Sequence, residues 1–154
     1  MKIIGLKKIN IDVVKNKKGD ILKFISKNNT FFRKFGEVYF SEIKKKKTKG
    51  WNLHKRNYCF LTVCYGKVIF TFIDGRKKSK SYYKKDMIIL DKKNYGLIIV
   101  PPGIWFSFKT KKKLSVVANC LDNPHSNNET VKNNKVNNYW ILNFMRVFMS
   151  YVHF

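Results

Sequence analysis

Residues 58–73 read YCFLTVCYGKVIFTFI, which places two runs of β-prone residues on either side of Gly66. β-branched and aromatic residues favour strands, and a glycine between two such runs favours a tight turn. In the second run both alternating sets of side chains are apolar or β-branched, namely Val68, Phe70 and Phe72 against Ile69, Thr71 and Ile73. A strand of this kind is covered on both faces, as it is inside a sandwich or a closed barrel. We therefore predict a hairpin in the centre of a layered β-domain.

Further short strands are predicted on both sides of this hairpin. Residues 37–43 alternate polar and apolar side chains with a period of two, which is typical of a half-buried strand. Four more apolar runs follow, with lysine, glycine or proline turns between them, at residues 87–90, 97–100, 104–108 and 114–121. Strands at roughly 8–12-residue spacing, with almost no helical periodicity, predict an all-β antiparallel sandwich or jelly roll.

The two ends of the chain are expected to differ from this central domain. The chain is accordingly divided into an N-terminal arm, a jelly-roll domain and a C-terminal loop and tail, at residues 1–36, 37–130 and 131–154. The arm is expected to hold one or two edge strands and a short helix around residues 30–34. Residues 127–138 are rich in asparagine and read as a loop. The apolar and aromatic residues 139–154 are expected to pack against the domain or in a dimer interface.

The sequence favours a cytoplasmic protein that does not contact a membrane. No run reaches the roughly 18 consecutive apolar residues that a membrane-spanning helix needs. Lysines interrupt the N-terminus too early for a signal peptide. Cys59, Cys64 and Cys120 lie in apolar runs and form no CxxC pair, so we expect reduced thiols in the core.

The charge of the chain is strongly positive. The 154 residues include 33 basic and 9 acidic side chains, a net charge of +24. Such a charge attracts nucleic acid, a membrane surface or a phosphorylated metabolite. However, only four of the basic residues are arginines, and the lysines occur in nearly every predicted turn. Because nucleic-acid binders tend to concentrate charge on one face or helix, we favour solvated turns, then a pocket for a small phosphorylated ligand, then nucleic acid.

Few side chains are available for catalysis. The histidines are His54, His125 and His153, and no P-loop, GxGxxG or GxSxG motif is present. The central segments offer one histidine, too few for the three or four ligands of a metal site, so neither a metal nor another cofactor is expected. His54 lies just before the predicted strand at residue 58, among basic neighbours that disfavour its protonated form. It is either a neutral base or an inert histidine at the rim of the domain.

Five segments in order resemble the dTDP-4-dehydrorhamnose 3,5-epimerase family and its sugar ketoisomerase relatives. The resemblance covers about residues 37–130, and its segments are Phe40–Ile43 with Lys49-Gly50-Trp51 and His54-Lys55, then Gly66-Lys67-Val68, Asp74-Gly75-Arg76 with Ser79, Val100–Phe108, and Asn119–Glu129. It implies a cupin-like jelly roll, a double-stranded β-helix, in a homodimer. It also implies a nucleotide-diphosphate 4-keto sugar as the ligand.

The resemblance also implies roles for individual residues. His54 would be the catalytic base, and His125 would donate a proton near the place of the family's tyrosine. The substrate-binding candidates are Lys49, Asn52, Lys55, Arg76, Ser79, Trp105 and Asn119, with Arg76 and Lys49 expected to hold the diphosphate. The chain departs from the family at Asn52, which replaces its usual catalytic histidine. It departs again at Trp105 or Phe106, where a histidine is usual after the Pro-Pro-Gly segment.

Three functions follow, in order of preference. The first is a nucleotide-sugar epimerase or isomerase in surface-polysaccharide biosynthesis, which removes a proton next to a 4-keto group. The second is a non-catalytic cupin that binds a sugar nucleotide, because Asn52 and the missing tyrosine depart from the family pattern. The third is a basic protein associated with nucleic acid. Deuterium uptake by the sugar separates the first two, and a steep salt dependence of oligonucleotide binding identifies the third.

Overall fold

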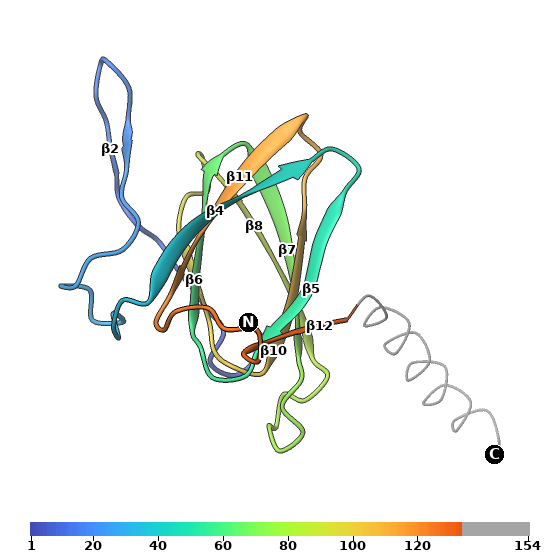
Figure 1. The fold of residues 1–154 in the computed structure, drawn as a ribbon. Coiled ribbons are helices and arrows are strands. Elements are labelled where there is room, and N and C mark those ends of the chain that lie inside the picture. Colours follow the sequence, from blue (N-terminus) through green and yellow to red (C-terminus); the bar gives the residue numbers. More distant parts are fainter. Residues whose placement is uncertain (134–154) are drawn as a thin grey trace.

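The computed structural model describes residues 1–133, which fold into two five-stranded antiparallel sheets that face each other (Figure 1). The first sheet has the order β1 (Lys7–Ile9), β9 (Leu97–Val100), β6 (Cys59–Tyr65), β11 (Leu114–Leu121) and β4 (Glu37–Lys44). The second has the order β12 (Thr130–Lys132), β5 (Thr48–His54), β10 (Ile104–Lys109), β7 (Lys67–Asp74) and β8 (Lys85–Asp91). The predicted all-β jelly roll is confirmed.

Most strands that follow each other in sequence lie in different sheets. The predicted hairpin at residues 58–73 is therefore wrong, because β6 and β7 belong to opposite sheets and Gly66 carries the chain between them. Gly66 has a φ of 81°, and a Cβ there would lie 2.2 Å from the Ser115 hydroxyl, so the crossing requires glycine. The apolar runs at residues 87–90 and 97–100 likewise lie in opposite sheets, on β8 and β9. In a jelly roll, strands pair with partners far away in sequence.

Apolar side chains from both sheets fill the space between them. From β7, Val68, Phe70 and Phe72 point into this core and are fully buried. On the opposite face of the same strand Ile73 is buried, while Ile69 and Thr71 are half-buried. The prediction that both faces of β7 are covered is thus confirmed for the core face. The opposite face is covered fully at Ile73 and partly at Ile69 and Thr71.

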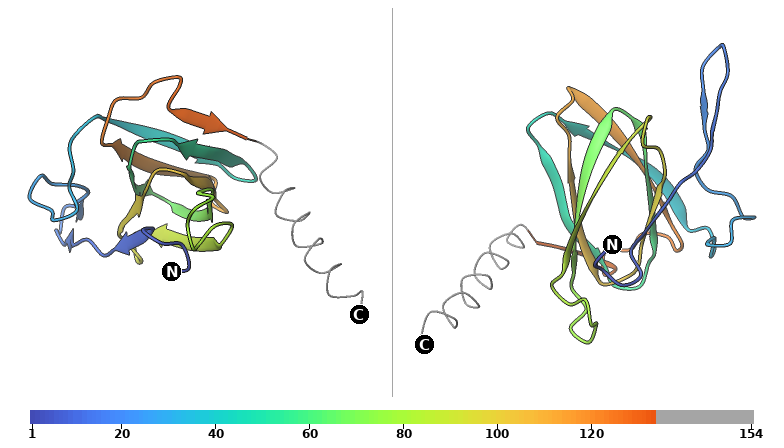
Figure 2. Two further views of the ribbon diagram at one scale, coloured as in Figure 1. Left: turned by 90° about the horizontal axis from the view of Figure 1, so that it is seen from below. Right: turned by 180° about the vertical axis from the view of Figure 1, so that it is seen from behind.

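The N-terminal arm covers the outer face of the first sheet. Its apolar side chains pack against a buried cluster on β6, β9 and β11, formed by Phe60, Leu97, Ile99 and Cys120. Two of its strands, β2 (Val13–Val14) and β3 (Ile21–Leu22), form a separate ribbon that stands away from the two sheets (Figure 2).

The short helix expected around residues 30–34 is not present. The segment consists of turns and irregular backbone, and the Ser26 and Asn29 side chains accept hydrogen bonds from nearby backbone N–H groups. Side chains that bond locally in this way compete with the hydrogen bonds of a helix.

The loop expected at residues 127–138 contains the strand β12, which adds to the edge of the second sheet beside β5. Glu129 fixes its start, because the buried carboxylate accepts hydrogen bonds from the backbone N–H groups of Arg56 and Asn57, at 2.7 and 2.8 Å. Both sheets thus extend beyond the central segment in which the sequence pattern is clear.

The expected packing of residues 139–154 lies outside the described residues. Within residues 1–133, no helix has the length and apolar character to cross a membrane.

Candidate active site

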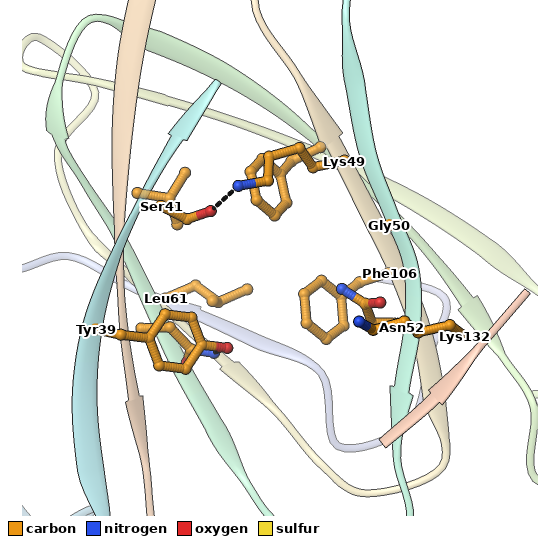
Figure 3. Close-up of a pocket in the computed structure, with 11 residues that line it drawn as sticks. Tyr39, Ser41, Lys49, Gly50, Asn52, Leu61, Phe106 and Lys132 are labelled. Carbon is orange, nitrogen blue, oxygen red and sulfur yellow. Dashed lines mark hydrogen bonds between the residues drawn. The ribbon is translucent and has the colours of Figure 1, made fainter. Parts of the chain in front are cut away.

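A cleft opens between the two sheets where β4 and β5 face each other. One part, a cavity of about 260 Å³, is lined by Tyr39, Ser41, Lys49, Gly50, Asn52, Leu61, Phe106, Phe108, Val117, Asn119 and Lys132 (Figure 3). A second part of about 350 Å³ is lined by Glu37, Tyr39, Asn52, His54, His125, Thr130 and Lys132. Because both parts share Tyr39, Asn52 and Lys132, we treat them as one cleft.

A β-bulge in β5 arranges the wall of the cleft on the second sheet. Asn52 pairs with Phe106 and Lys49 pairs with Phe108, while the register shifts by one residue between Phe106 and Ser107. Simple alternation would place Lys49 and Asn52, three positions apart, on opposite faces of the strand. The extra residue in the bulge restores both to the inner face, alongside the two phenylalanines. Lys49 and Asn52, both candidates for substrate binding, therefore line the cleft together.

The opposite wall is formed by the first half of β4, where polar side chains face inward and Phe40 faces outward. Glu37, Tyr39 and Ser41 line the cleft, whereas Phe40 on the outer face is 67% exposed. A half-buried strand usually turns its apolar side chains inward. Here the inward positions at this end of the barrel face a cavity, so polar groups occupy them.

His54, the last residue of β5, lies deep in the cleft and is only 4% exposed. Its ring stacks on Phe106, with centroids 6.2 Å apart and planes 13° apart. Within residues 1–133 its Nδ1 atom is buried without a hydrogen-bond partner. Burial is the main reason that the His54 pKa is lowered from 6.5, with Glu129 acting in the opposite direction. Near neutral pH the imidazole is therefore uncharged and able to accept a proton, although the cause is burial and not the basic neighbours considered above.

Asn119 and Tyr39 form a polar pair on the first sheet. They are directly opposite each other on β11 and β4, and the Asn119 Nδ2 atom donates a hydrogen bond of 2.7 Å to the Tyr39 hydroxyl. Asn119 is 2% exposed, and its Oδ1 atom is buried without a partner in the described part of the chain. Partial desolvation raises the pKa of Tyr39 to about 12, and 40% of the residue remains exposed.

Lysines supply positive charge at the cleft. The Lys49 ammonium group donates a hydrogen bond to the Ser41 hydroxyl at 2.5 Å and so connects the two walls (Figure 3). Lys132 of β12 lines both parts of the cleft. These cations are suited to hold an anionic group such as a diphosphate.

Arg76 and Ser79, expected to bind substrate, lie outside the cleft and bind Asp74 instead. The Arg76 Nε and Nη2 atoms donate to the Asp74 carboxylate at 2.8 Å each, and Ser79 Oγ donates to it at 2.8 Å. Arg76 also donates to the carbonyl of Ile4 in the arm. Asp74 is fully buried, and its carboxylate requires such partners. The sequence motif is present, but it fastens the loop between β7 and β8 to the N-terminal arm.

Trp105 and Lys55 are likewise placed elsewhere than expected. Trp105 alternates with the inward-facing Ile104 and Phe106, so it lies on the outer face of the second sheet, packed against Trp51 and Ile73. Lys55 follows β5 and is exposed, and it is not among the residues that line the cleft.

His125 does reach the cleft, although it is exposed. Its backbone N–H donates to the Glu37 carboxylate at 3.1 Å, and its Nδ1 atom lies 3.5 Å from the Thr130 hydroxyl. The structure thus brings together His54, His125, Lys49, Asn52 and Asn119 among the residues selected from sequence.

Sequence reasoning missed several lining residues, above all Tyr39, Phe106 and Lys132. Tyr39 stands two positions from Ser41, so period-two alternation connects it to the same face once that face is known to border a cavity. Lys132 lies on β12, in the segment where the sequence predicts a loop. In the described segment 1–133, no three His, Cys, Asp or Glu side chains converge in a way that could hold a metal ion.

The fold and the family of the chain are established by comparison with known proteins. The sequence model of the dTDP-4-dehydrorhamnose 3,5-epimerase family matches residues 1–143. A dTDP sugar isomerase from Desulfovibrio desulfuricans is 27% identical, with a TM-score of 0.85 over 88% of this chain and 87% of that one.

More distant structures share the fold. An epimerase from Legionella pneumophila, solved with dTDP-4-keto-L-rhamnose, is 17% identical, with a TM-score of 0.76 over 86% of this chain and 74% of that one. The dTDP-4-dehydrorhamnose 3,5-epimerase from Sulfolobus tokodaii is 18% identical, with a TM-score of 0.72 over 84% and 82%. No curated protein sequence matches this chain. By the match over residues 1–143, the chain belongs to the dTDP-4-dehydrorhamnose 3,5-epimerase family.

Proposed function

We propose that this protein is a nucleotide-sugar epimerase or isomerase, which removes a proton next to the 4-keto group of a dTDP-linked sugar. The observation that carries the proposal is His54, a buried imidazole with a lowered pKa and an unpartnered Nδ1 atom at the cleft. A neutral base on the wall of a cleft is suited to this chemistry. Family membership supports the same reaction class.

The reaction follows from the acidity of a carbon beside a carbonyl group. His54 takes the proton from that carbon, and the electron pair of the C–H bond moves to give an enolate. The negative oxygen needs a positive or hydrogen-bonding group nearby, and the Asn52 amide lines the same part of the cleft as His54. Return of a proton to the opposite face of the carbon inverts the centre.

Substrate binding is assigned to the groups that border the rest of the cleft. We assign the diphosphate to Lys49 and Lys132, and a sugar hydroxyl to the buried Oδ1 atom of Asn119, which lacks a partner within residues 1–133. Phe106 and Phe108 offer apolar surface to the sugar ring. Arg76 is assigned to the fold because its guanidinium is already bound to Asp74 and Ile4.

We assign the protein to the cytoplasm and to surface-polysaccharide biosynthesis, and we propose that it forms a homodimer. The apolar outer face of the second sheet supports the dimer. There Met87 is 63% exposed and Ile89 is 37% exposed on the edge strand β8, near Ile73 and Trp105. A second copy on this face would cover both the apolar residues and an open sheet edge.

A second candidate function is that of a cupin that binds sugar nucleotides without turning them over. Asn52 favours this alternative, because an amide stands where the family's catalytic histidine is usual. It differs from the first proposal in one measurable step, the removal of a carbon-bound proton.

The test is proton exchange in heavy water, with dTDP-4-keto-6-deoxyglucose as the probe. The parent protein is expected to introduce deuterium next to the keto group. His54→Ala is expected to slow this exchange by about 10²–10⁴-fold while the affinity for dTDP changes little. Binding of dTDP by the parent without any exchange would favour the second candidate. An H54A protein that exchanges at the parental rate would remove His54 from the mechanism.

A further inference from the structure

Lysine-rich turns that are far apart in the sequence meet at one end of the barrel. The β4–β5 turn and the β10–β11 loop are joined by a hydrogen bond from the Lys45 backbone N–H to the Lys113 carbonyl oxygen, at 3.2 Å. The β6–β7 turn adjoins them, because the Lys67 backbone N–H donates to the Ser115 hydroxyl at 3.1 Å. All three turns lie at the upper end of the barrel in Figure 1. Charge that is scattered along the sequence is therefore concentrated in the fold.

Most lysines of these turns are exposed and unpaired in the part of the chain that the structure describes. Their ammonium groups take part in no ion pair or hydrogen bond there, and the set consists of Lys44, Lys45, Lys46, Lys47, Lys109, Lys111, Lys112 and Lys113. Lys67 differs from them, because it is paired with Asp91 at 3.2 Å. Like charges on neighbouring turns repel one another, and a bound polyanion relieves this repulsion.

A groove opens at this end of the barrel, on the outer face of the first sheet. Its volume is about 900 Å³, and it is lined by Glu42, Lys44, Tyr65, Gly66, Lys112, Lys113 and Leu114. Because Ile43 points into the core, its neighbours Glu42 and Lys44 stand on the opposite face of β4. The groove and the candidate active site therefore lie on different faces of this strand, and each can be occupied without the other.

Tyr65 gives the groove an aromatic surface beside the lysines. The residue is 63% exposed, although it ends a strand in the middle of the first sheet. An exposed aromatic ring next to cations is suited to a single nucleic-acid strand, because a base stacks on the ring while the cations contact phosphates. A groove also fits a linear chain of phosphates better than it fits the flat surface of a membrane. No arginine lines the groove to read a base through paired hydrogen bonds.

We propose that this end of the barrel binds a single-stranded nucleic acid without sequence preference. The phosphates contact Lys44, Lys112 and Lys113 along the groove, and one base stacks on Tyr65. In the sequence, the spread of lysines over many turns weighs against nucleic acid. In the fold, several of these turns share one face, which is the arrangement typical of nucleic-acid binders. The proposal is independent of the catalytic function.

The test is the binding of a fluorescently labelled oligoadenylate of about 12 nucleotides, measured by anisotropy with excess dTDP present to compete for the cleft. Each phosphate contact with a single strand adds about 0.7 to the slope of log K against log salt concentration. A variant with Lys44, Lys46, Lys112 and Lys113 changed to glutamine should therefore lose about 3 from this slope, and about 10²–10³-fold in affinity at about 0.1 M salt. Tyr65→Ser should weaken binding by about tenfold, through the loss of stacking.

The matched control changes four exposed lysines of the β7–β8 loop, at the opposite end of the barrel, to glutamine: Lys77, Lys78, Lys80 and Lys84. It removes the same charge and should bind within a few-fold of the parent. All substituted lysines are exposed, and urea unfolding checks that each variant folds.

Equal losses of affinity in the two lysine variants would overturn the proposal, because they would show that net charge alone attracts the strand. Unchanged binding by Y65S would overturn it as well. Binding of the parent to phosphatidylglycerol vesicles without binding to oligoadenylate would assign this end to a membrane surface instead.

Discussion

Individual side chains in the cleft acquire their chemistry from burial as much as from their neighbours. His54 and Asn119 are each almost fully buried, and each keeps one polar atom without a partner in the described residues. Such atoms carry a free-energy cost in the folded protein unless a ligand supplies the missing hydrogen bond. Arg76 shows the converse case, because its charge is already used by the buried Asp74. Residue type and spacing alone could not distinguish a cation that is available to a ligand from one that is already paired with a carboxylate of the protein.

The lowered pKa of His54 predicts a pH dependence of stability. Between its folded pKa and 6.5, the unfolded chain binds a proton at this residue and the folded chain does not. The free energy of unfolding contributed by His54 is therefore fully present above pH 6.5 and is lost as the pH falls through the folded pKa. We expect the parent to lose more stability than His54→Gln between pH 7.5 and pH 5.5, measured by urea unfolding. Equal losses in the two proteins would contradict this assignment.

Strands and turns were foreseen more reliably than their pairing. The β-prone runs at residues 37–43, 58–65 and 67–73 all became strands, because alternation and composition act locally. Their partners could not be read from sequence order, since a turn such as Gly66 can close a hairpin or carry the chain to another sheet. The bulge in β5 could not be read from sequence order either, and it decides which side chains of this strand line the cleft. Without it, alternation separates Lys49 from Asn52, and only the family resemblance named both as candidates for one site.

The bulge in β5 depends on Gly50. Its φ is 105°, and a Cβ at this position would lie 2.6 Å from the Phe106 carbonyl oxygen. We expect Gly50→Ala to lower the free energy of unfolding by about 1–3 kcal/mol and to weaken dTDP binding, because Lys49 and Asn52 shift with the strand. Denaturant unfolding and calorimetric titration measure the two effects.

Gly19 offers a control for this substitution. It also has a positive φ, 133°, but nothing lies within 4 Å of a Cβ there. Gly19→Ala therefore imposes backbone strain without the steric clash, and it lies in the ribbon outside the cleft. A loss of dTDP affinity as large in G19A as in G50A would show that the bulge does not position the site.

At the level of the whole molecule, apolar material is distributed over three places and not one. It fills the space between the sheets, it lies under the N-terminal arm on the first sheet, and it covers part of the outer face of the second sheet. The 44% apolar content of the sequence is ample for a core, but composition does not reveal that two of these clusters lie outside the space between the sheets. The arm covers one of them. The proposed second copy of the chain covers the other.

Electrostatic repulsion between the two chains opposes the dimer, because each chain carries a net charge of +24. Repulsion between like charges is screened beyond a Debye length of about 8 Å at physiological ionic strength and reaches much further at low salt. Burial of apolar surface is far less sensitive to salt over this range. We therefore expect a monomer–dimer equilibrium that shifts toward the dimer as the salt concentration rises from about 0.02 M to about 0.3 M. Sedimentation equilibrium measures this shift. Met87→Lys adds charge within the proposed interface and should give a folded monomer at all salt concentrations. Tyr65→Lys adds the same charge elsewhere and should follow the parent. A dimer of M87K as stable as that of the parent would place the interface on another surface.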